Sequence, residues 1–425
     1  MLTPDEGYLD RRIAQEAASL AAVGWSVDIE PTADPALRFD GDLPAAVRLH
    51  AAPGPGPVPG PARRALRAAR RVMARAAPPI DHLVEAARYR VSDRARAMAD
   101  AHVGRLAAAE PFDLIVAHDA PVFPLAVRLK EQWACRLICD LHEVFAEQDE
   151  HFTTETARSY WRSVERSGLA EADGILCVNP AVAEYARATH SPVADCVIVH
   201  NSVPFVEGAR LHGPSGRGPS GHAPSIRDLY PIPPGAQIML FAGSLRPHTN
   251  LEALIEGFGR AELDGWILAL LGDGPLRPQL ERLVRQGGSE SRIFLGRRAS
   301  QRELIAVASS ADVGLLPYQP VGINHEVATP NKLFEYIQAR VPIATSRLPM
   351  IERIVGANGN GDYVDFASAE STAEGLRRFV AGPLARIGRP ELEAAARQFS
   401  WEADEQTLLD LVDRVMSPTA RRPRR

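Results

Sequence analysis

The segment Ala311–Ser346, ADVGLLPYQPVGINHEVATPNKLFEYIQARVPIATS, contains the pattern that decides the fold. An apolar run at Val313–Leu316 precedes a helix-like stretch at Thr329–Tyr336, and a second apolar run follows at Val341–Ala344. Neither run alternates polar with apolar residues, so both faces of each predicted strand are expected to be buried. Strand, helix and strand in this order predict one unit of a parallel sheet covered by helices on both faces.

The same alternation continues along the chain, on both sides of a Gly/Pro/Ser-rich segment, Gly213–Ser225, that lacks apolar periodicity. The length of 425 residues also exceeds what one core usually supports, about 250 residues. We therefore predict an α/β protein with two doubly wound, Rossmann-like domains that face each other across a cleft. The other predicted strands are Asp113–Val116, Arg136–Cys139, Gly174–Val178, Cys196–Val199, Gln237–Phe241, Trp266–Leu271 and Arg292–Leu295.

The predicted boundaries are an N-terminal domain at 1–208, a linker at 209–226 and a C-terminal domain at 227–395. The first domain reads as a helix at Arg11–Val23 followed by a strand at Trp25–Ile29, whereas such a domain normally opens with a strand. Because Met1–Leu9 holds no apolar run, the opening strand is expected to be missing. Either the start codon is assigned downstream of the true one, which we favour, or the sheet lacks this strand.

Composition excludes several classes of protein. A formal charge of -5 argues against bulk nucleic-acid binding, and no apolar run is long enough to span a membrane. The N-terminus shows no secretory leader, and the four cysteines lack metal-ligand spacing, so we expect buried thiols in a cytoplasmic protein. Only Lys130 and Lys332 are lysines, which makes each of them worth attention.

Polar and glycine residues follow the predicted strands directly. The carboxyl ends of parallel strands meet at one edge of a sheet, where ligands usually bind. Glycines at this edge let a ligand approach the backbone, although any one of them could simply form a turn. The candidates at the two edges are His118, Asp119, His142, Glu143, Asn179, Asn201, Gly243, Ser244, Gly272, Asp273, Gly274, Gly296, Arg297, Pro317 and Tyr318.

The helix after Thr329 is the sharpest single signal. Thr329 is a good N-cap and Pro330 suits the first helical position, so the amides of Asn331, Lys332 and Leu333 should be free to bind an anion. Lys332 adds a cation, and Glu335, one turn later, offers an acceptor for sugar hydroxyls. The alternative is a capped surface helix with a Lys/Glu pair.

Taken together, these motifs resemble the GT-B glycosyltransferases, specifically the retaining family-4 group that uses nucleotide-sugar donors. The resemblance covers most of the chain and depends on the order and spacing of the motifs. They are DLIVAHD (Asp113–Asp119), DLHE (Asp140–Glu143), VIVHNSV (Val197–Val203), FAGSLRP (Phe241–Pro247), LLGDGP (Leu270–Pro275), FLG (Phe294–Gly296), ADVGLLPY (Ala311–Tyr318) and TPNKLFEYIQARVPIATS (Thr329–Ser346).

The resemblance implies retaining transfer of a sugar from a nucleoside diphosphate to a hydroxyl, with the nucleotide on the C-terminal domain and most of the acceptor on the N-terminal domain. Residues 396–416 would form a helix that crosses back to the N-terminal domain, before a basic tail at 417–425. Glu335 would bind the donor ribose, and His118 would lie near the reacting sugar. Catalytic roles fall on His118, Arg246, Lys332 and Glu335. Donor binding falls on Gly243, Ser244, Gly274, Arg297, Glu326, Thr329, Asn331 and Leu333, and acceptor contacts on Asp119, His142 and Glu143.

The chain departs from the family pattern at the diphosphate site. Two positions that are cationic in many relatives hold Ser244 and Thr249, which leaves Arg246, Lys332 and Arg297 to compensate. The position of a frequent upstream glutamate holds Val327, with Glu326 beside it. These departures favour, as the second hypothesis, an inactive relative that binds nucleotide or glycan or serves as a partner subunit; a nucleotide-sugar epimerase is a distant third.

The remaining expectations concern partners. The donor would be a nucleotide sugar, and the acceptor a carbohydrate, a lipid-linked molecule or a small molecule; neither a metal nor another cofactor is expected. Residues 62–76 read as a basic amphipathic helix, for which peripheral contact with anionic lipid at the inner membrane face and a plain solvated face both stay open. His142 could contact the acceptor or could be a hydrogen-bonded structural histidine.

Overall fold

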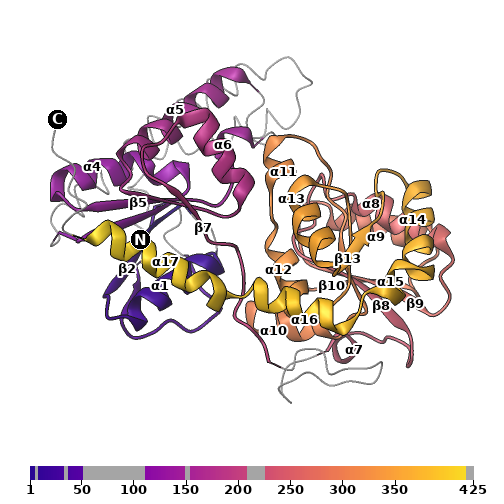
Figure 1. The fold of residues 1–425 in the computed structure, drawn as a ribbon. Helices are drawn as coiled ribbons and strands as arrows, with labels where there is room; N and C mark the ends of the chain where they lie inside the picture. Colours follow the sequence, from indigo (N-terminus) through magenta and orange to yellow (C-terminus); the bar gives the residue numbers. More distant parts are fainter. Residues whose placement is uncertain (5–7, 33–36, 51–110, 149–153, 208–224, 418–425) are drawn as a thin grey trace, which may run out of the picture.

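The computed structural model describes residues 1–4, 8–32, 37–50, 111–148, 154–207 and 225–417. Figure 1 shows two α/β halves side by side, the N-terminal one in indigo and magenta and the C-terminal one in orange. Each half contains one parallel sheet with helices on both faces, as the apolar runs predicted. Within the described ranges, no helix combines the length and apolar character needed to span a membrane.

The N-terminal sheet has strand order β3-β2-β1-β4-β5-β6-β7 among the described residues. Its strands are β1 (Leu2–Thr3), β2 (Val27–Pro31), β3 (Val47–Leu49), β4 (Leu114–His118), β5 (Arg136–Leu141), β6 (Gly174–Cys177) and β7 (Cys196–Ile198). Its helices are α1 (Arg11–Ala22), η1 (Ala120–Val122), α4 (Phe123–Trp133), η2 (Phe145–Glu147), α5 (Glu155–Glu171) and α6 (Pro180–His190).

The expectation that the opening strand is missing is wrong. Leu2 and Thr3 form β1, which pairs in parallel with β2 on one side and with β4 on the other. Both residues are buried, and the terminal amino group donates a hydrogen bond of 2.6 Å to the carbonyl of Asp28. A strand that has neighbours on both sides is held by their ladders, so two residues suffice. So short a strand produces no apolar run that sequence reasoning could detect.

The C-terminal sheet has strand order β10-β9-β8-β11-β12-β13. Its strands are β8 (Gln237–Ala242), β9 (Trp266–Leu271), β10 (Ile293–Gly296), β11 (Val313–Leu316), β12 (Ile343–Thr345) and β13 (Gly361–Tyr363). Its helices are α7 (Ile226–Leu229), α8 (Leu251–Ala261), α9 (Arg277–Gln286), α10 (Gln301–Ser309), α11 (Ile323–Val327), α12 (Asn331–Gln338), α13 (Pro349–Ile351), η3 (Glu352–Gly356), α14 (Ala369–Ala381), α15 (Pro383–Arg386) and α16 (Arg389–Gln398).

Burial explains why this sheet could be recognised. Every residue of β9 is buried, because one apolar cluster covers each face of the sheet. The strand predicted at Val341–Ala344 begins two residues later, at Ile343. Pro342 has no amide hydrogen to donate to a ladder, so it precedes the strand and contributes only its carbonyl, which accepts from the amide of Gly314.

The last helix, α17 (Trp401–Met416), lies against the N-terminal half, next to α1 (Figure 1). Leu408, Leu411 and Val415 belong to the same buried cluster as Ile13 of α1. By contrast, α16 packs into the C-terminal core. The first C-terminal helix, α7, begins at Ile226, the last residue of the predicted linker, and linker residues 209–224 lie outside the described ranges.

Candidate active site

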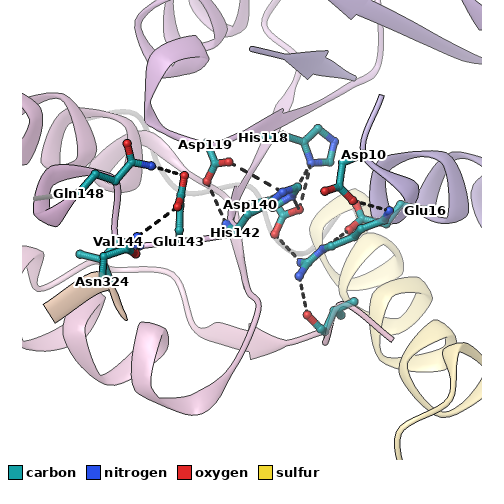
Figure 2. Close-up of polar contacts among 12 residues, drawn as sticks. Asp10, Glu16, His118, Asp119, Asp140, His142, Glu143, Val144, Gln148 and Asn324 are labelled. Atoms are coloured by element: carbon teal, nitrogen blue, oxygen red, sulfur yellow. Dashed lines mark hydrogen bonds and ion pairs between the residues drawn. The ribbon is translucent and has the colours of Figure 1, made fainter. Parts of the chain in front are cut away.

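The loops at the carboxyl ends of the two sheets contact each other. Asn324 of α11 donates to a carboxylate oxygen of Glu143 at 3.2 Å and accepts from the amide of Val144 at 3.0 Å (Figure 2). Asn179, which follows β6, donates to the carbonyl of Val327 at 2.8 Å. These contacts place Glu143 and Asn179, two of the residues predicted at strand ends, at the interface between the domains.

The start of α12 differs in detail from the prediction. The helix begins at Asn331 with Pro330 as the N-cap residue, and Thr329 caps nothing. Instead, the buried Thr329 hydroxyl accepts a hydrogen bond of 3.2 Å from Asn179 of the other domain. The amide of Leu333 is not free, because it donates to the carbonyl of Pro330, and its side chain lies in the core. Of the three amides predicted to bind an anion, those of Asn331 and Lys332 therefore remain as candidates.

Lys332 is 9% exposed and points toward the carboxyl end of β8. Its amino group donates to the hydroxyl of Tyr318 at 2.5 Å and lies 4.3 Å from the ring centroid of Phe241. A Cβ built on Gly243, whose φ is +153°, would lie 2.6 Å from this amino group. Lys332 and Gly243 were both predicted, and the structure brings them together. The aromatic rings hold the cation without neutralising it.

Glu335 lies one turn after Lys332 and faces the N-terminal domain. Its carboxylate forms a 2.9 Å ion pair with Arg11, the first residue of α1. Both side chains are largely buried, at 16% and 8% exposed for Arg11 and Glu335. The start of α12 therefore points into the domain interface, and the alternative of a capped surface helix is wrong.

The other predicted donor-side residues are more dispersed. Gly274, with φ +157°, packs against the backbone of Leu245, while Ser244 and Arg246 are exposed. Glu326 is exposed on α11. The Arg297 side chain forms ion-paired hydrogen bonds of 2.6 and 2.9 Å with Glu303, and its amide donates to Tyr230. Within the described residues, the Arg297 guanidinium is thus held by Glu303 and not by the groups around Lys332.

On the N-terminal side, His118 lies at the end of β4 in a buried polar network (Figure 2). Its Nδ1 is 3.0 Å from Oδ2 of Asp140 and 3.2 Å from Nε2 of His142, which itself is 2.7 Å from the same carboxylate oxygen. The other oxygen of Asp140 accepts from Arg12 at 2.5 Å. His118 Nε2 is buried and has no partner among the described residues.

These surroundings give the two histidines different protonation states. Burial lowers the pKa of His118 to about 4, so this ring is neutral near pH 7. Burial also opposes the charged form of His142, but the carboxylates of Asp140 and Asp119 outweigh it and raise its pKa to about 10. Although burial opposes ionisation of Asp140, the neighbouring Arg12 guanidinium holds the pKa of that carboxyl well below its usual range. A neutral His118 beside an ionised Asp140 donates through Nδ1 and keeps Nε2 as an acceptor.

Among the described residues, one group could coordinate a metal: His118, Asp140 and His142, whose ligand atoms lie within 4.8 Å of one another. However, Arg12 occupies one oxygen of Asp140, and Asp140 holds His142 in its charged form. A divalent cation would add a third positive charge beside these two. We therefore interpret the three residues as a hydrogen-bond network.

The predicted acceptor-side residues all have hydrogen-bond partners within the protein. Asp119 accepts from the amide of His142 at 2.9 Å, and burial raises its pKa to about 7. Glu143 accepts hydrogen bonds from Gln148 and Asn324 (Figure 2). His142 is thus hydrogen-bonded within this network, and its contact with an acceptor stays a prediction.

Sequence reasoning did not single out Arg11, which pairs with Glu335, or Arg12 and Asp140, which belong to the network around His118. Arg11 and Arg12 directly follow the N-cap residue Asp10, so they lie at the helix start next to the sheet edge. That position was the available signal, because the first helix of such a domain begins at the edge where ligands bind. Asp140 directly follows the apolar run of β5 and belongs to the DLHE motif, but nothing in the local sequence indicates its contact with Arg12.

Comparison with known proteins agrees with this architecture. Residues 9–202 match the family described as "Glycosyl transferase 4-like domain", and residues 223–399 match "Glycosyl transferases group 1". A curated relative, the lipopolysaccharide core biosynthesis glycosyltransferase LpsE of Rhizobium meliloti, is 28% identical over 185 residues. That match covers 42% of this chain and spans about half, 51%, of the relative's length.

Solved structures share the whole fold at low identity. Sucrose-phosphate synthase from Thermosynechococcus elongatus superimposes with a TM-score of 0.66 at 20% identity, covering 97% of this chain and 95% of the other. Anabaena HepE, solved in complex with UDP-glucose, gives 0.62 at 11% identity, covering 97% and 98%. With one matched family domain on each side of the interface that the Arg11–Glu335 pair bridges, the chain belongs to the family-4-like glycosyltransferases of GT-B fold.

Proposed function

We propose that this protein transfers a sugar from a nucleoside-diphosphate sugar to a hydroxyl acceptor with retention of configuration. The acceptor would be a carbohydrate, a lipid-linked molecule or a small molecule, in the assembly of polysaccharide, glycolipid or natural product. The observation that carries the proposal is the position of Glu335, the expected ribose ligand. It is buried at the domain interface, one turn from a lysine and from two helix-start amides.

The chemistry follows from where negative charge develops. When the bond from the sugar to the diphosphate breaks, the leaving group gains charge, and fixed donors aimed at it stabilise the transition state. Lys332, the amides of Asn331 and Lys332, and the dipole of α12 supply those donors. Departure on the same face as acceptor attack lets the diphosphate take the acceptor's proton, so no side-chain base is needed.

His118 would contribute by accepting a hydrogen bond. Its Nε2 is buried without a partner among the described residues, and the Asp140 carboxylate beside Nδ1 fixes Nε2 as the acceptor atom. Such an atom can orient a sugar hydroxyl near the reacting carbon, and the low pKa of the ring keeps it in this form at neutral pH.

The fold relatives support a nucleotide-sugar donor, since Anabaena HepE was crystallised with UDP-glucose. No metal ion enters the proposal, because protein donors are to balance the diphosphate charge; activity should therefore survive treatment with EDTA. The idea that residues 62–76 contact anionic lipid stays a prediction, since this segment lies outside the described residues.

The test begins with thermal stabilisation by UDP, GDP, ADP and TDP, which identifies the base. Saturation about a hundredfold above Kd should raise Tm by roughly 2–4 °C. With the matching nucleotide sugar and an acceptor extract, the protein should release nucleoside diphosphate, and NMR of the isolated product should show a retained anomeric configuration.

Substitutions connect this release to the site. Lys332→Ala and Glu335→Ala should abolish it. Lys130→Ala is the matched control, because Lys130 lies on α4 and pairs with Asp173 at 2.8 Å, away from the domain interface. Release that survives both Lys332→Ala and Glu335→Ala would contradict the proposal.

A second candidate, an inactive relative that binds nucleotide or glycan or serves as a partner subunit, rests on a specific observation. Thr249 stands where many relatives have a lysine; it is buried, and its hydroxyl donates to the carbonyl of Arg246. Ser244 and Val327 likewise supply no charge. Nucleotide-dependent stabilisation without release under any condition would favour this candidate.

A further inference from the structure

Arg11 is the N-terminal domain's contribution to the donor side of the interface. The pair that it forms with Glu335 joins residues 324 positions apart, and both side chains are less than one-fifth exposed. Toward the described residues, its guanidinium donates one hydrogen bond, from Nη1 to Glu335. A guanidinium has five N–H groups in a planar fork, so most of its capacity is uncommitted to those residues.

The donor side needs such a cation. Lys332 supplies one buried charge, whereas Arg246 is exposed to solvent, Arg297 is paired with Glu303, and Thr249 is neutral. A nucleoside diphosphate carries more negative charge than one lysine balances. Arginine is always charged and can bind two phosphate oxygens at once. The guanidinium of Arg11 lies at the Glu335 carboxylate, one helical turn from the start of α12 where the phosphate would bind.

Donor binding must also break the ion pair between Arg11 and Glu335. If ribose hydroxyls take the Glu335 carboxylate, Arg11 loses its counterion in a largely buried place, which is costly unless another anion arrives. The diphosphate of the same ligand is that anion. One molecule therefore brings a new partner for both members of the pair.

We propose that Arg11 is a donor-binding residue, an inference that rests on the proposed function. While the site is empty, Arg11 pairs with Glu335. When the donor's ribose binds Glu335, the Arg11 guanidinium moves to bind the donor's diphosphate instead. The N-terminal domain then completes a diphosphate site from which two cationic positions of related enzymes have been lost. Since Arg11 and Glu335 lie on different domains, binding of donor would also change what holds the domains together.

Binding measurements distinguish this role from one in which Arg11 only pairs with Glu335 and does not contact the donor. By isothermal titration calorimetry with the nucleoside diphosphate selected above, Arg11→Ala should weaken binding about 10- to 100-fold, and Arg11→Lys less. Affinity for the corresponding nucleoside, which lacks phosphate, should stay the same or increase, because Glu335 is freed. Circular dichroism melts verify that both variants are folded.

Arg353→Ala is the matched control. Arg353 also forms an ion pair across the domains, at 3.5 Å from Glu184, but this pair is exposed to solvent. The substitution should change neither affinity. Unchanged or tighter diphosphate binding in Arg11→Ala would overturn the inference and leave the proposed function standing. Failure of the unsubstituted protein to bind any nucleoside diphosphate would instead remove the proposed function, and this inference with it.

Discussion

Gly243 provides the space into which the Lys332 amino group extends. Because a Cβ there would lie 2.6 Å from both Cε and Nζ of Lys332, alanine should push the flexible end of the lysine away from the start of α12. We expect Gly243→Ala to weaken nucleoside-diphosphate binding by about tenfold or more, since a charge-assisted contact is lost. Isothermal titration calorimetry measures this directly.

Gly235→Ala is the control for backbone strain. Gly235 also has a positive φ, +79°, but a Cβ at this position meets nothing within 4 Å. It should lower Tm without changing nucleotide affinity. If both alanine variants lost affinity equally, strain in the backbone, and not displacement of Lys332, would explain the effect.

His142 should make stability depend on pH. Its pKa is about 10 in the folded protein against 6.5 in the unfolded chain, because Asp140 and Asp119 outweigh the effect of burial. Below pH 6.5 both states hold the proton, so the stabilisation is complete; between 6.5 and 10 the unfolded chain loses its proton first, and stability falls as pH rises.

The variant His142→Gln isolates this contribution. It should be less stable than the unsubstituted protein at pH 6.5, because the buried Asp140 carboxylate, and Asp119 to the extent that it is ionised, lose a neighbouring cation. The difference in urea midpoint, followed by circular dichroism at pH 6.5, 8 and 9.5, should shrink as pH rises. A difference that is constant over this range would show that the imidazole of His142 is not charged in the folded protein.

The site could be predicted where one segment encodes it. The cation, acceptor and free amides of α12 are close in sequence, so the motif alone indicated Lys332 and Glu335. The partner of Glu335 could not be found in this way, because Arg11 lies in another domain and pairs with it only after both have folded. The separation in pKa between His118 and His142 likewise arises from burial and from Asp140, neither of which local sequence reports.

Helices α8 and α14 pack closely on one face of the C-terminal sheet, and Gly257 permits this contact. A Cβ on Gly257 would lie 2.5 Å from the Cβ of Thr372 and 2.9 Å from the carbonyl of Ala369. Gly257→Ala should therefore destabilise the protein by about 1–3 kcal/mol through overpacking. Chemical denaturation followed by circular dichroism measures the change.

Gly259, two residues later in the same helix, provides the comparison. Its nearest neighbour to an added Cβ is the Ser289 hydroxyl at 3.7 Å, so alanine fits. Gly259→Ala should stabilise by roughly 0.5–1 kcal/mol, because it removes backbone freedom from the unfolded chain. Destabilisation by both substitutions would mean that α8 tolerates no side chain on either position.

The helices and strands differ in how well the sequence predicts them. β9 and β11 are buried on both faces, so each forms an uninterrupted apolar run that marks a strand. β1 is equally buried, but two residues cannot form a run, and only its neighbours reveal it. The N-terminus of α12 was displaced by one residue from the prediction, because Thr329 binds Asn179 across the interface instead of capping the helix.

Helix α17 follows the C-terminal domain in sequence but packs on the N-terminal sheet. The indole of Trp401 donates to the hydroxyl of Ser19 at 3.0 Å, and a Cβ on Gly174 of β6 would touch Leu411 and Val415 at 3.0 Å. The N-terminal core thus contains residues from both ends of the sequence. Its stability should depend on a helix that lies beyond the C-terminal domain.

Two core truncations, one in each domain, test whether α17 stabilises the N-terminal domain. Leu411 is 4% exposed in the N-terminal cluster, and Leu376 of α14 is fully buried in the C-terminal one. Each change to alanine should cost about 2–5 kcal/mol. Hydrogen-exchange mass spectrometry should show faster exchange in β4, β5 and β6 for Leu411→Ala, and in β8 and β9 for Leu376→Ala. If Leu411→Ala loosened the C-terminal sheet and spared the N-terminal one, α17 would belong energetically to the domain that precedes it, and the crossing would not stabilise the N-terminal half.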